Sequence, residues 1–376
     1  MTSLQLLDAH DPQVQPIWSG LEAVAAPSFF LSWGWIENWL AALPPEHAPQ
    51  LAVIRNGDQP VAAFFTGKRR IHRRGVVPST ALYLNATGNE RCDDVCLEHN
   101  GLLRDPRSGV SLETVLDHLP GGWDELFLPA VDRTDASIFD RLHQLDRRGL
   151  RVRVDKELAV PFVDLELVRA ASAGYLSMLT PQMRTQIRRT QREVGEVELE
   201  VARDHTHALD IYRELLQLHT KRAHALGKPG TFSDAFHECV HRRLIETQHP
   251  HGAIQLLRLT ASGVTLGCLY NFVYRGRVLC YQAGFEQFED KHIQPSSLCH
   301  ALAIEHNAAA GAAIYDLLAD PGRGHRALAT GVTHLVWLRV QRKLARFGIE
   351  HRLERLKHAL TSWRGRGIAD EVPFGA

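Results

Sequence analysis

Apolar and polar residues alternate along two neighbouring segments in the second half of the chain. Apolar residues stand at every second position over 264–274, which is the period of a β-strand. An Arg-Gly pair can then form a turn, and a second apolar run follows over 278–283. The pattern predicts a β-hairpin, followed by a polar loop over 284–295 and a third short strand over 312–318.

A helix is predicted between this loop and the third strand. Pro295 fixes the backbone at the helix start, and either of the two serines that follow it can cap the helix. Apolar side chains recur at helical spacing, and Gly311 ends the helix. The first turn of a helix has unpaired N–H groups and a partial positive charge, so it can bind a pyrophosphate or a carboxylate. The candidate anion-binding residues are Gln294, Ser296, Ser297 and Leu298.

The rest of the chain reads as an α/β protein with a mostly antiparallel first half. Strands are predicted over residues 4–7, 51–55, 61–71, 80–86, 94–103, 125–130, 150–154 and 333–340. Helices are predicted over residues 11–25, 29–43, 110–119, 137–147, 180–194, 209–226, 233–247 and 342–366. The helix at 29–43 carries an aromatic face, and large rings at this spacing are core residues more often than ligand contacts.

Two of these helices are basic. The helix at 180–194 carries four arginines, and the helix at 342–366 has eight Lys or Arg against two Glu. Both patterns fit a solvated surface. The first helix could also clamp a phosphate, because an arginine fork matches phosphate geometry. The second could contact RNA or an acidic membrane surface.

Residues 237–241 read HECVH, which matches the HExxH pattern of zinc enzymes. In those enzymes two histidines one helical turn apart bind the metal, and the glutamate acts as a base. The chain contains 21 histidines, so a chance match is the competing interpretation. No third ligand follows at a metalloprotease spacing, and we therefore expect no metal.

Length and composition limit the class of protein. A chain of 376 residues exceeds one ordinary core and suggests two domains. Its apolar fraction of 44% and charged fraction of 23% are typical of a soluble globular protein. No apolar run approaches the ~18 residues needed to span a bilayer, and the first residues lack a signal-peptide pattern, so we expect a cytoplasmic location. The six cysteines form no CxxC pair, which favours reduced thiols. A formal net charge of zero gives no general attraction for nucleic acid.

Several segments resemble a known family. YQAGFEQFEDKHIQPSS, a helix and then AAIYDLLADPGRGHRALAT resemble the second domain of GNAT acyltransferases of the cellulose-biosynthesis CelD type, which are similar to Fem-type peptidyltransferases. FFLSWGWIENWLAALP and LTPQMRTQIRRTQREVG also fit this likeness, which covers roughly residues 25–345. The resemblance implies two tandem GNAT-like domains, each a mixed, largely antiparallel sheet flanked by helices. We place them at 1–170 and 171–345, with a basic helix and tail over 346–376.

The resemblance also implies site residues. Acyl transfer to an amine needs a polarised carbonyl and a proton acceptor. Backbone N–H groups over 280–284 could polarise the carbonyl. The candidate catalytic residues are Asp316, Tyr281 and His325. The candidate substrate-binding residues are His219 and Arg222, expected to face a cleft between the domains, and Arg323 in the loop after the third strand.

Three functions follow from this likeness. The first is an N-acyltransferase with acyl-CoA, or a carrier-bound acyl group, as donor and an amine as acceptor. The second is an aminoacyl-tRNA-dependent ligase of Fem type, which the basic helices would suit. The third is a non-catalytic GNAT-like binding protein in a polysaccharide pathway. The start of the helix at 295 lacks the glycine that CoA-binding members usually carry, and for this reason the non-catalytic function remains an alternative. The oligomeric state cannot be read from the residues.

Overall fold

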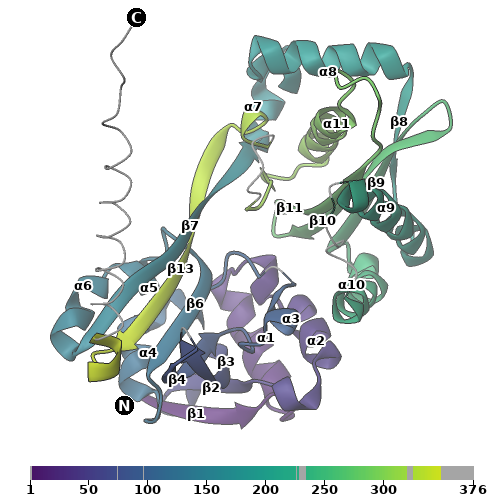
Figure 1. Cartoon of the computed structure of the whole chain (residues 1–376). Helices are drawn as coiled ribbons and strands as arrows, with labels where there is room; N and C mark the ends of the chain where they lie inside the picture. The colour runs from purple at the N-terminus through teal and green to yellow at the C-terminus, as the bar shows by residue number, and fades with distance from the viewer. Residues whose placement is uncertain are drawn as a thin grey trace, which may run out of the picture.

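One continuous mixed sheet organises the protein (Figure 1). The computed structural model describes residues 2–73, 75–95, 97–225, 227, 234–319 and 325–348. Within them the strand order is β1-β2-β3-β4-β6-β13-β7-β12-β11-β10-β9-β8, and β5 pairs with β3. The strands are β1 Thr2–Asp8, β2 Gln50–Asn56, β3 Gln59–Arg73, β4 Val77–Leu84, β5 Leu103–Arg104, β6 Glu125–Asp132, β7 Leu150–Asp164, β8 Val197–Val201, β9 Ile254–Ala261, β10 Val264–Tyr274, β11 Arg277–Phe285, β12 Ile314–Asp316 and β13 Gly331–Arg342.

Helices flank this sheet in two groups. We call the part built from β1–β6 and α1–α6 the N-terminal half, and the part built from β8–β12 and α7–α11 the C-terminal half. The helices are α1 Val14–Ala25, α2 Trp33–Ala42, α3 Glu90–Asp93, α4 Leu112–His118, α5 Ala136–Phe139, α6 Leu142–Leu145, α7 Leu165–Ala170, α8 Pro181–Val194, α9 His205–Ala225, α10 Ala235–Gln248 and α11 Pro295–Ala309.

The strand order is nearly the same when read inward from either end. In the N-terminal half, β1 to β4 run antiparallel and β4 then pairs with β6 in parallel. In the C-terminal half, β8 to β11 run antiparallel and β11 pairs with β12 in parallel. The expected mixed, largely antiparallel sheet flanked by helices is confirmed.

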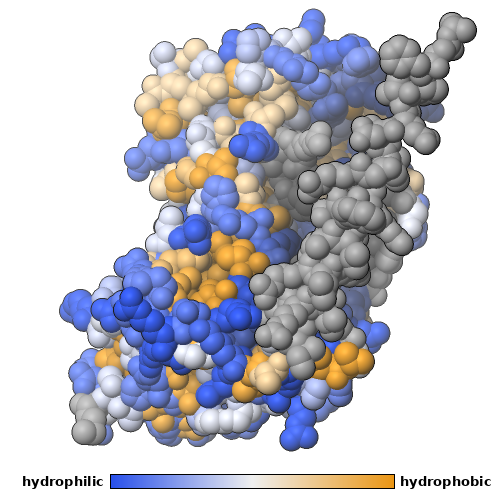
Figure 2. Space-filling model, turned by 60° about the vertical axis from the view of Figure 1, so that its left-hand side comes forward, coloured by the Kyte–Doolittle hydropathy of each residue, from blue (hydrophilic) through white to orange (hydrophobic). Residues whose placement is uncertain are grey.

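Two long strands join the halves. Figure 1 shows β7 and β13 running together from one half to the other. β13 pairs along its length with β7, from Gly331 opposite Phe162 to Arg342 opposite Leu150, and on its other edge with β6. The end of β7 pairs with β12. A strand late in the sequence therefore lies within the sheet of the N-terminal half. In Figure 2 apolar surface gathers at the waist between the halves.

The predicted aromatic helix forms a core shared by the two halves. A 3₁₀ turn, Phe29–Leu31, precedes α2, and the Ser32 hydroxyl accepts the N–H of Trp35 as its cap. Phe29 stacks on Phe272 of β10 with ring centroids 4.4 Å apart. Both rings are buried, so the prediction of a core role is confirmed.

One predicted strand is wrong, and one strand was missed. Residues 94–103 form a loop after the short helix α3, and only β5 at their end is a strand. The Asp93 carboxylate accepts the backbone N–H groups of Thr87 and Gly88, which folds this segment back on itself. Strand β9 was not predicted, although its residues alternate between buried and half-buried positions.

Candidate active site

Strands β11 and β12 diverge after three paired residues. The parallel pairing runs from Arg277 opposite Ile314 to Leu279 opposite Asp316, where β12 ends. β11 continues to Phe285, so within the described residues its edge beyond Leu279 has no strand partner on that side. The expected opening at 280–284 lies at this point.

A β-bulge shapes β11 at the same place. Tyr270 of β10 pairs with Gln282 and Asn271 pairs with Cys280, which leaves Tyr281 as the extra residue. The N–H of Ala283 donates to Oε1 of the neighbouring Gln282 side chain over 3.1 Å. A side-chain partner of this kind can be displaced, so the N–H is available to a ligand carbonyl.

Helix α9 packs directly against β11. A Cβ added at Gly284 would lie 2.6 Å from the backbone oxygen of Leu215, so only glycine permits this approach. His219 and Arg222, candidates from the sequence, lie on the last turns of α9. Burial lowers the pKa of His219, and the nearby Arg222 lowers it further. Lys221 pairs with Glu286 at the end of β11, which holds this end of α9 beside the opening.

The start of α11 is anchored on α8. Gln294 occupies the N-cap position without a side-chain cap, so the prediction that a serine caps this helix is wrong. Its N–H donates to the Thr190 hydroxyl over 3.0 Å. Ser296 is half-buried, whereas Ser297 and Leu298 are buried. Of these candidates, the exposed Gln294 and the half-buried Ser296 are the ones whose side chains a ligand at the helix start could meet.

Asp316 lies in a buried ion-pair network between the halves. It accepts a hydrogen bond from Arg277 over 3.0 Å, and its carboxylate lies 3.1 Å from Nε2 of His99. The other ring nitrogen of His99 lies 3.6 Å from Asp132. Burial raises the pKa of Asp316, but His99 and Arg277 outweigh it and hold the pKa below its usual value. Asp316 is therefore a paired carboxylate.

His99 is the cation of this network. Burial lowers its pKa, but the hydrogen bonds to Asp132 and Asp316 outweigh burial and raise it to about 9. The imidazolium is thus the form present at neutral pH. Because Asp132 belongs to β6 and Asp316 to β12, the network holds the two halves together.

Tyr281 is hydrogen-bonded to both halves. Its hydroxyl donates to the backbone oxygen of Val95 and lies 3.0 Å from Nε2 of His241. The Tyr281 proton is given to Val95, so the His241 ring is the donor in the second contact. Burial lowers the pKa of His241 to about 3, which leaves the ring neutral.

The HECVH histidines therefore have structural partners. His241 is hydrogen-bonded to the Tyr281 hydroxyl, and Nε2 of His237 donates to the backbone oxygen of Asp94 over 2.8 Å. No group of three metal-ligating side chains occurs among the described residues. The remaining sequence candidates are less defined: His325 begins a 3₁₀ turn, His325–Ala327, and Arg323 lies outside the described residues.

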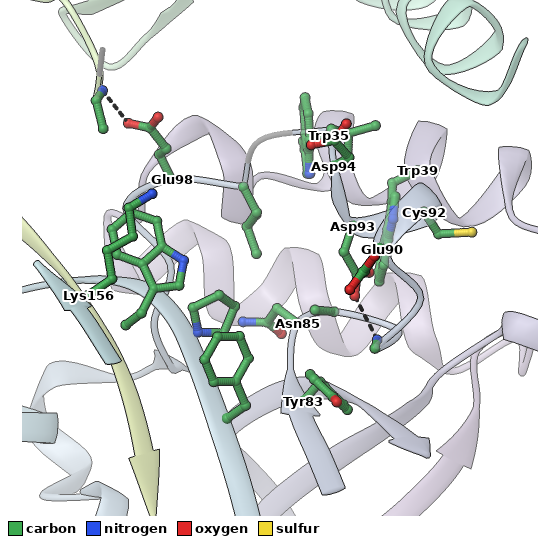
Figure 3. A pocket seen from close by; sticks show the side chains of 18 of the residues that line it. Trp35, Trp39, Tyr83, Asn85, Glu90, Cys92, Asp93, Asp94, Glu98 and Lys156 are labelled. Carbon is green, nitrogen blue, oxygen red and sulfur yellow. Dashed lines mark hydrogen bonds between the residues drawn. The ribbon is translucent and has the colours of Figure 1, made fainter. Parts of the chain in front are cut away.

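A cavity of about 620 Å³ lies beside the opening (Figure 3). It is lined by the loop after β4, by α2, and by β6, β7 and β13, with Ala319 following β12. The aromatic lining residues are Trp35, Trp39, Tyr83, Phe127 and Trp337. The charged lining residues are Glu90, Asp93, Asp94, Glu98 and Lys156. Val95, the partner of Tyr281, also lines the cavity, which therefore adjoins the bulge of β11.

Glu98 is the carboxylate of this cavity suited to proton transfer. Its residue is 9% exposed, and Oε2 accepts the N–H of Ala319 over 2.9 Å. Burial raises its pKa to about 7, against the smaller lowering effects of the Ala319 N–H and of His99. A carboxylate with this pKa can accept a proton near neutral pH. Sequence reasoning missed Glu98 because the segment was predicted as a strand, although four acidic residues within nine positions were a usable signal.

Comparison with known proteins identifies a domain. Residues 181–326 match the family model described as "Acetyltransferase (GNAT) domain". No curated protein matches the sequence. None of the helices in the described ranges is long and apolar enough to cross a membrane.

Solved structures share the fold at low identity. The structure of FemX matches with a TM-score of 0.58 and 10% identity, over 90% of this chain and 98% of its own. L-PGS from Bacillus licheniformis matches with a TM-score of 0.50 and 11% identity, over 90% and 93% of the two chains. A tandem GNAT protein from the clavulanic acid biosynthesis pathway matches with a TM-score of 0.47 and 13% identity, over 92% and 100%. The GNAT domain, on this fold, assigns the protein as an acyltransferase; the CelD-like type stays a prediction.

Proposed function

We propose that the protein transfers an acyl group from acyl-CoA to an amine, with the donor on the C-terminal half and the acceptor in the cavity. The observation that carries this proposal is that a hydrogen bond connects β11, whose edge is open beyond Leu279, to the wall of the cavity that contains Glu98. Tyr281 links them, because it forms the bulge and bonds to Val95 in the cavity wall. Donor and acceptor would then meet at the waist of the molecule.

The difference between the halves supports this division of roles. In the C-terminal half the segment between the parallel strands contains the 15-residue helix α11, whose first turn can hold a pyrophosphate. In the N-terminal half the equivalent segment contains α4, of seven residues, and carries Glu90, Asp93, Asp94 and Glu98. Carboxylates repel phosphate, so the donor is assigned to the C-terminal half.

The reaction follows from these positions. The thioester carbonyl would lie against the N–H of Ala283, which polarises it and stabilises the oxyanion of the tetrahedral intermediate. Glu98 accepts a proton from the ammonium of the acceptor, and the free amine attacks the carbonyl carbon. The C–S bond then breaks and CoA leaves as a thiolate, which takes up the second proton of the attacking nitrogen as the neutral amide forms. The ion pair of Asp316 and His99 would hold the two halves in a fixed position relative to each other.

The test is acyl transfer from acetyl-CoA to a panel of amines by the wild type and Glu98→Gln. Replacing a general base is expected to lower kcat by about 10²- to 10⁴-fold. The control is Glu37→Gln, which removes an exposed carboxylate from α2 outside the cavity. Equal activity of wild type and Glu98→Gln would remove Glu98 from the mechanism.

A second donor is favoured by one feature of α8. Arg188 and Arg192 of this helix line a shallow surface hollow of about 370 Å³. Arginines on an exposed helix can contact a phosphate backbone, so an aminoacyl-tRNA donor is the alternative. Under this alternative Arg188→Gln/Arg192→Gln would weaken binding of charged tRNA and would leave acetyl-CoA binding unchanged.

A further inference from the structure

We infer that the acceptor is a cationic amine on an apolar or aromatic body that bears no phosphate, and that it binds in the cavity of the N-terminal half. This inference rests on the proposed function for the identity of the ligand as acceptor. It adds the chemical class, which follows from the shape, the rings and the charges of the cavity.

The size of the cavity sets the scale of the ligand. A volume of about 620 Å³ lies within the range of ~300 to 1,000 Å³ that is common for small-molecule sites. The cavity is bounded by strands of the shared sheet on one side and by α2 on the other. A small molecule, or the amine-bearing end of a larger one, fits this space.

The walls are aromatic. Trp35 and Trp39 of α2 are 1% and 3% exposed, so their rings are held rigidly in the core. Tyr83 and Phe127 meet edge to face with ring centroids 5.8 Å apart. An aromatic lining suits an apolar body, and a ring face turned to the cavity attracts a cation through the ring quadrupole. Both properties suit an ammonium carried on a hydrocarbon.

The charges of the cavity select a cation. The Asp93 carboxylate is held by Thr87 and Gly88, whereas Glu90 and Asp94 are exposed at the cavity. In Figure 3 these three carboxylates lie on the side of the two tryptophans, and Glu98 lies on the opposite side. A cationic ligand thus meets carboxylates at both ends, while a phosphate meets repulsion.

Lys156 is the single cation among the described lining residues. Its Nζ lies 4.6 Å from the centre of the Trp337 ring, on the same side as Glu98 in Figure 3. The ammonium of a ligand would occupy the space beside Glu98, whose charge Lys156 now partly neutralises. The ammonium of Lys156 therefore competes with the ammonium of the ligand for the cavity carboxylate, and removing Lys156 should strengthen ligand binding.

The test is calorimetric titration of the full-length protein, without an acyl donor, with three probes. Tryptamine is the cationic aromatic amine, indole-3-acetate is an aromatic anion of similar size, and phosphoethanolamine is an amine that carries phosphate. We expect saturable binding of tryptamine and none of the other two. Tighter binding of indole-3-acetate or phosphoethanolamine than of tryptamine would overturn the inference.

Two variants give effects of opposite sign. Asp94→Asn removes an exposed carboxylate and should weaken tryptamine binding by up to about fivefold, the scale of an exposed ion pair. Lys156→Met removes the opposing cation and should strengthen binding by a similar factor. Both positions are exposed, so both variants should fold. Effects of the same sign, or none, would contradict an electrostatic basis.

The outcome also separates this inference from the proposed function. Binding of tryptamine together with a failure to bind acyl-CoA or to acylate any amine would support a cation site in the cavity and would contradict acyl transfer. Acylation of a phosphate-bearing amine together with no binding of tryptamine would support acyl transfer and would contradict the inferred class of acceptor.

Discussion

Replacing Glu98 with glutamine should make the protein more stable at alkaline pH. The pKa of this carboxyl is raised by burial from 4.5 to about 7, so the folded state takes up a proton that the unfolded state has already lost. The glutamine amide oxygen can still accept the N–H of Ala319, so the variant loses the buried charge and keeps the hydrogen bond. The residue is 9% exposed, so solvent screens little of the effect.

The size of the effect follows from linkage. The group contributes stability that is fully present below the unfolded pKa of 4.5 and is lost as the pH rises through about 7. At about 1.4 kcal/mol for each pH unit between the two values, the loss is about 3 kcal/mol when complete. Between pH 5 and pH 8, Glu98→Gln should therefore gain roughly 2 to 3 kcal/mol in free energy of unfolding relative to the wild type.

The assay is urea unfolding of both proteins at pH 5 and pH 8, with the free energy of unfolding extrapolated to water. Groups that do not interact with Glu98 titrate alike in both proteins, so their contribution cancels in the difference. Glu37→Gln, on the exposed face of α2, serves as the control and should show the same difference at both pH values. A difference between wild type and Glu98→Gln that does not change with pH would refute the raised pKa and the role built on it.

Three further predictions concern the site and its supports. The acyl-transfer rate, kcat/KM, should fall as the pH is lowered through about 7, where Glu98 becomes protonated, and a flat profile from pH 6 to 8 would contradict its role as base. Gly284→Ala should cost about 1 to 3 kcal/mol of stability by thermal unfolding, because the new Cβ meets the α9 backbone, while Gly20→Ala, with open space around it, should not. His99→Gln should cost about 1 to 3 kcal/mol because it removes one of the two partners of the buried Asp316 charge, and adding Asp316→Asn should restore part of the loss. The wild type should also lose stability as the pH rises from 6.5 through about 9, a loss absent in His99→Gln; an equal loss in both would disprove the pairing.

The elements that carry their own periodic pattern could be predicted from the sequence. The hairpin of β10 and β11 alternates along nearly its whole length, and α11 follows a proline and helical spacing, so both were located within a few residues. The opening in β11 could also be placed, because a polar loop directly follows the strand.

Features that depend on distant pairing could not be predicted. The position of β13 between β6 and β7 follows from pairings between residues 169 to 216 positions apart, from Gly331 with Phe162 to Gln341 with Glu125, which no local pattern encodes. Asp316 could be placed near the end of a strand, but its partners His99 and Arg277 come from other elements. Glu98 acquires its raised pKa from burial, and its hydrogen bond to the N–H of Ala319 is again a contact across the chain. Spacing alone gives none of these.

The most direct test of the central claim is calorimetric titration with acetyl-CoA of the wild type, Ser296→Glu and Ser172→Glu. Ser296 is in the first turn of α11, where an added carboxylate would oppose a pyrophosphate, and Ser172 is exposed outside the proposed site. The account predicts saturable binding by the wild type and Ser172→Glu, and strongly weakened binding by Ser296→Glu. Absence of binding by the wild type, or equal binding by all three proteins, would contradict an acyl-CoA donor at the start of α11.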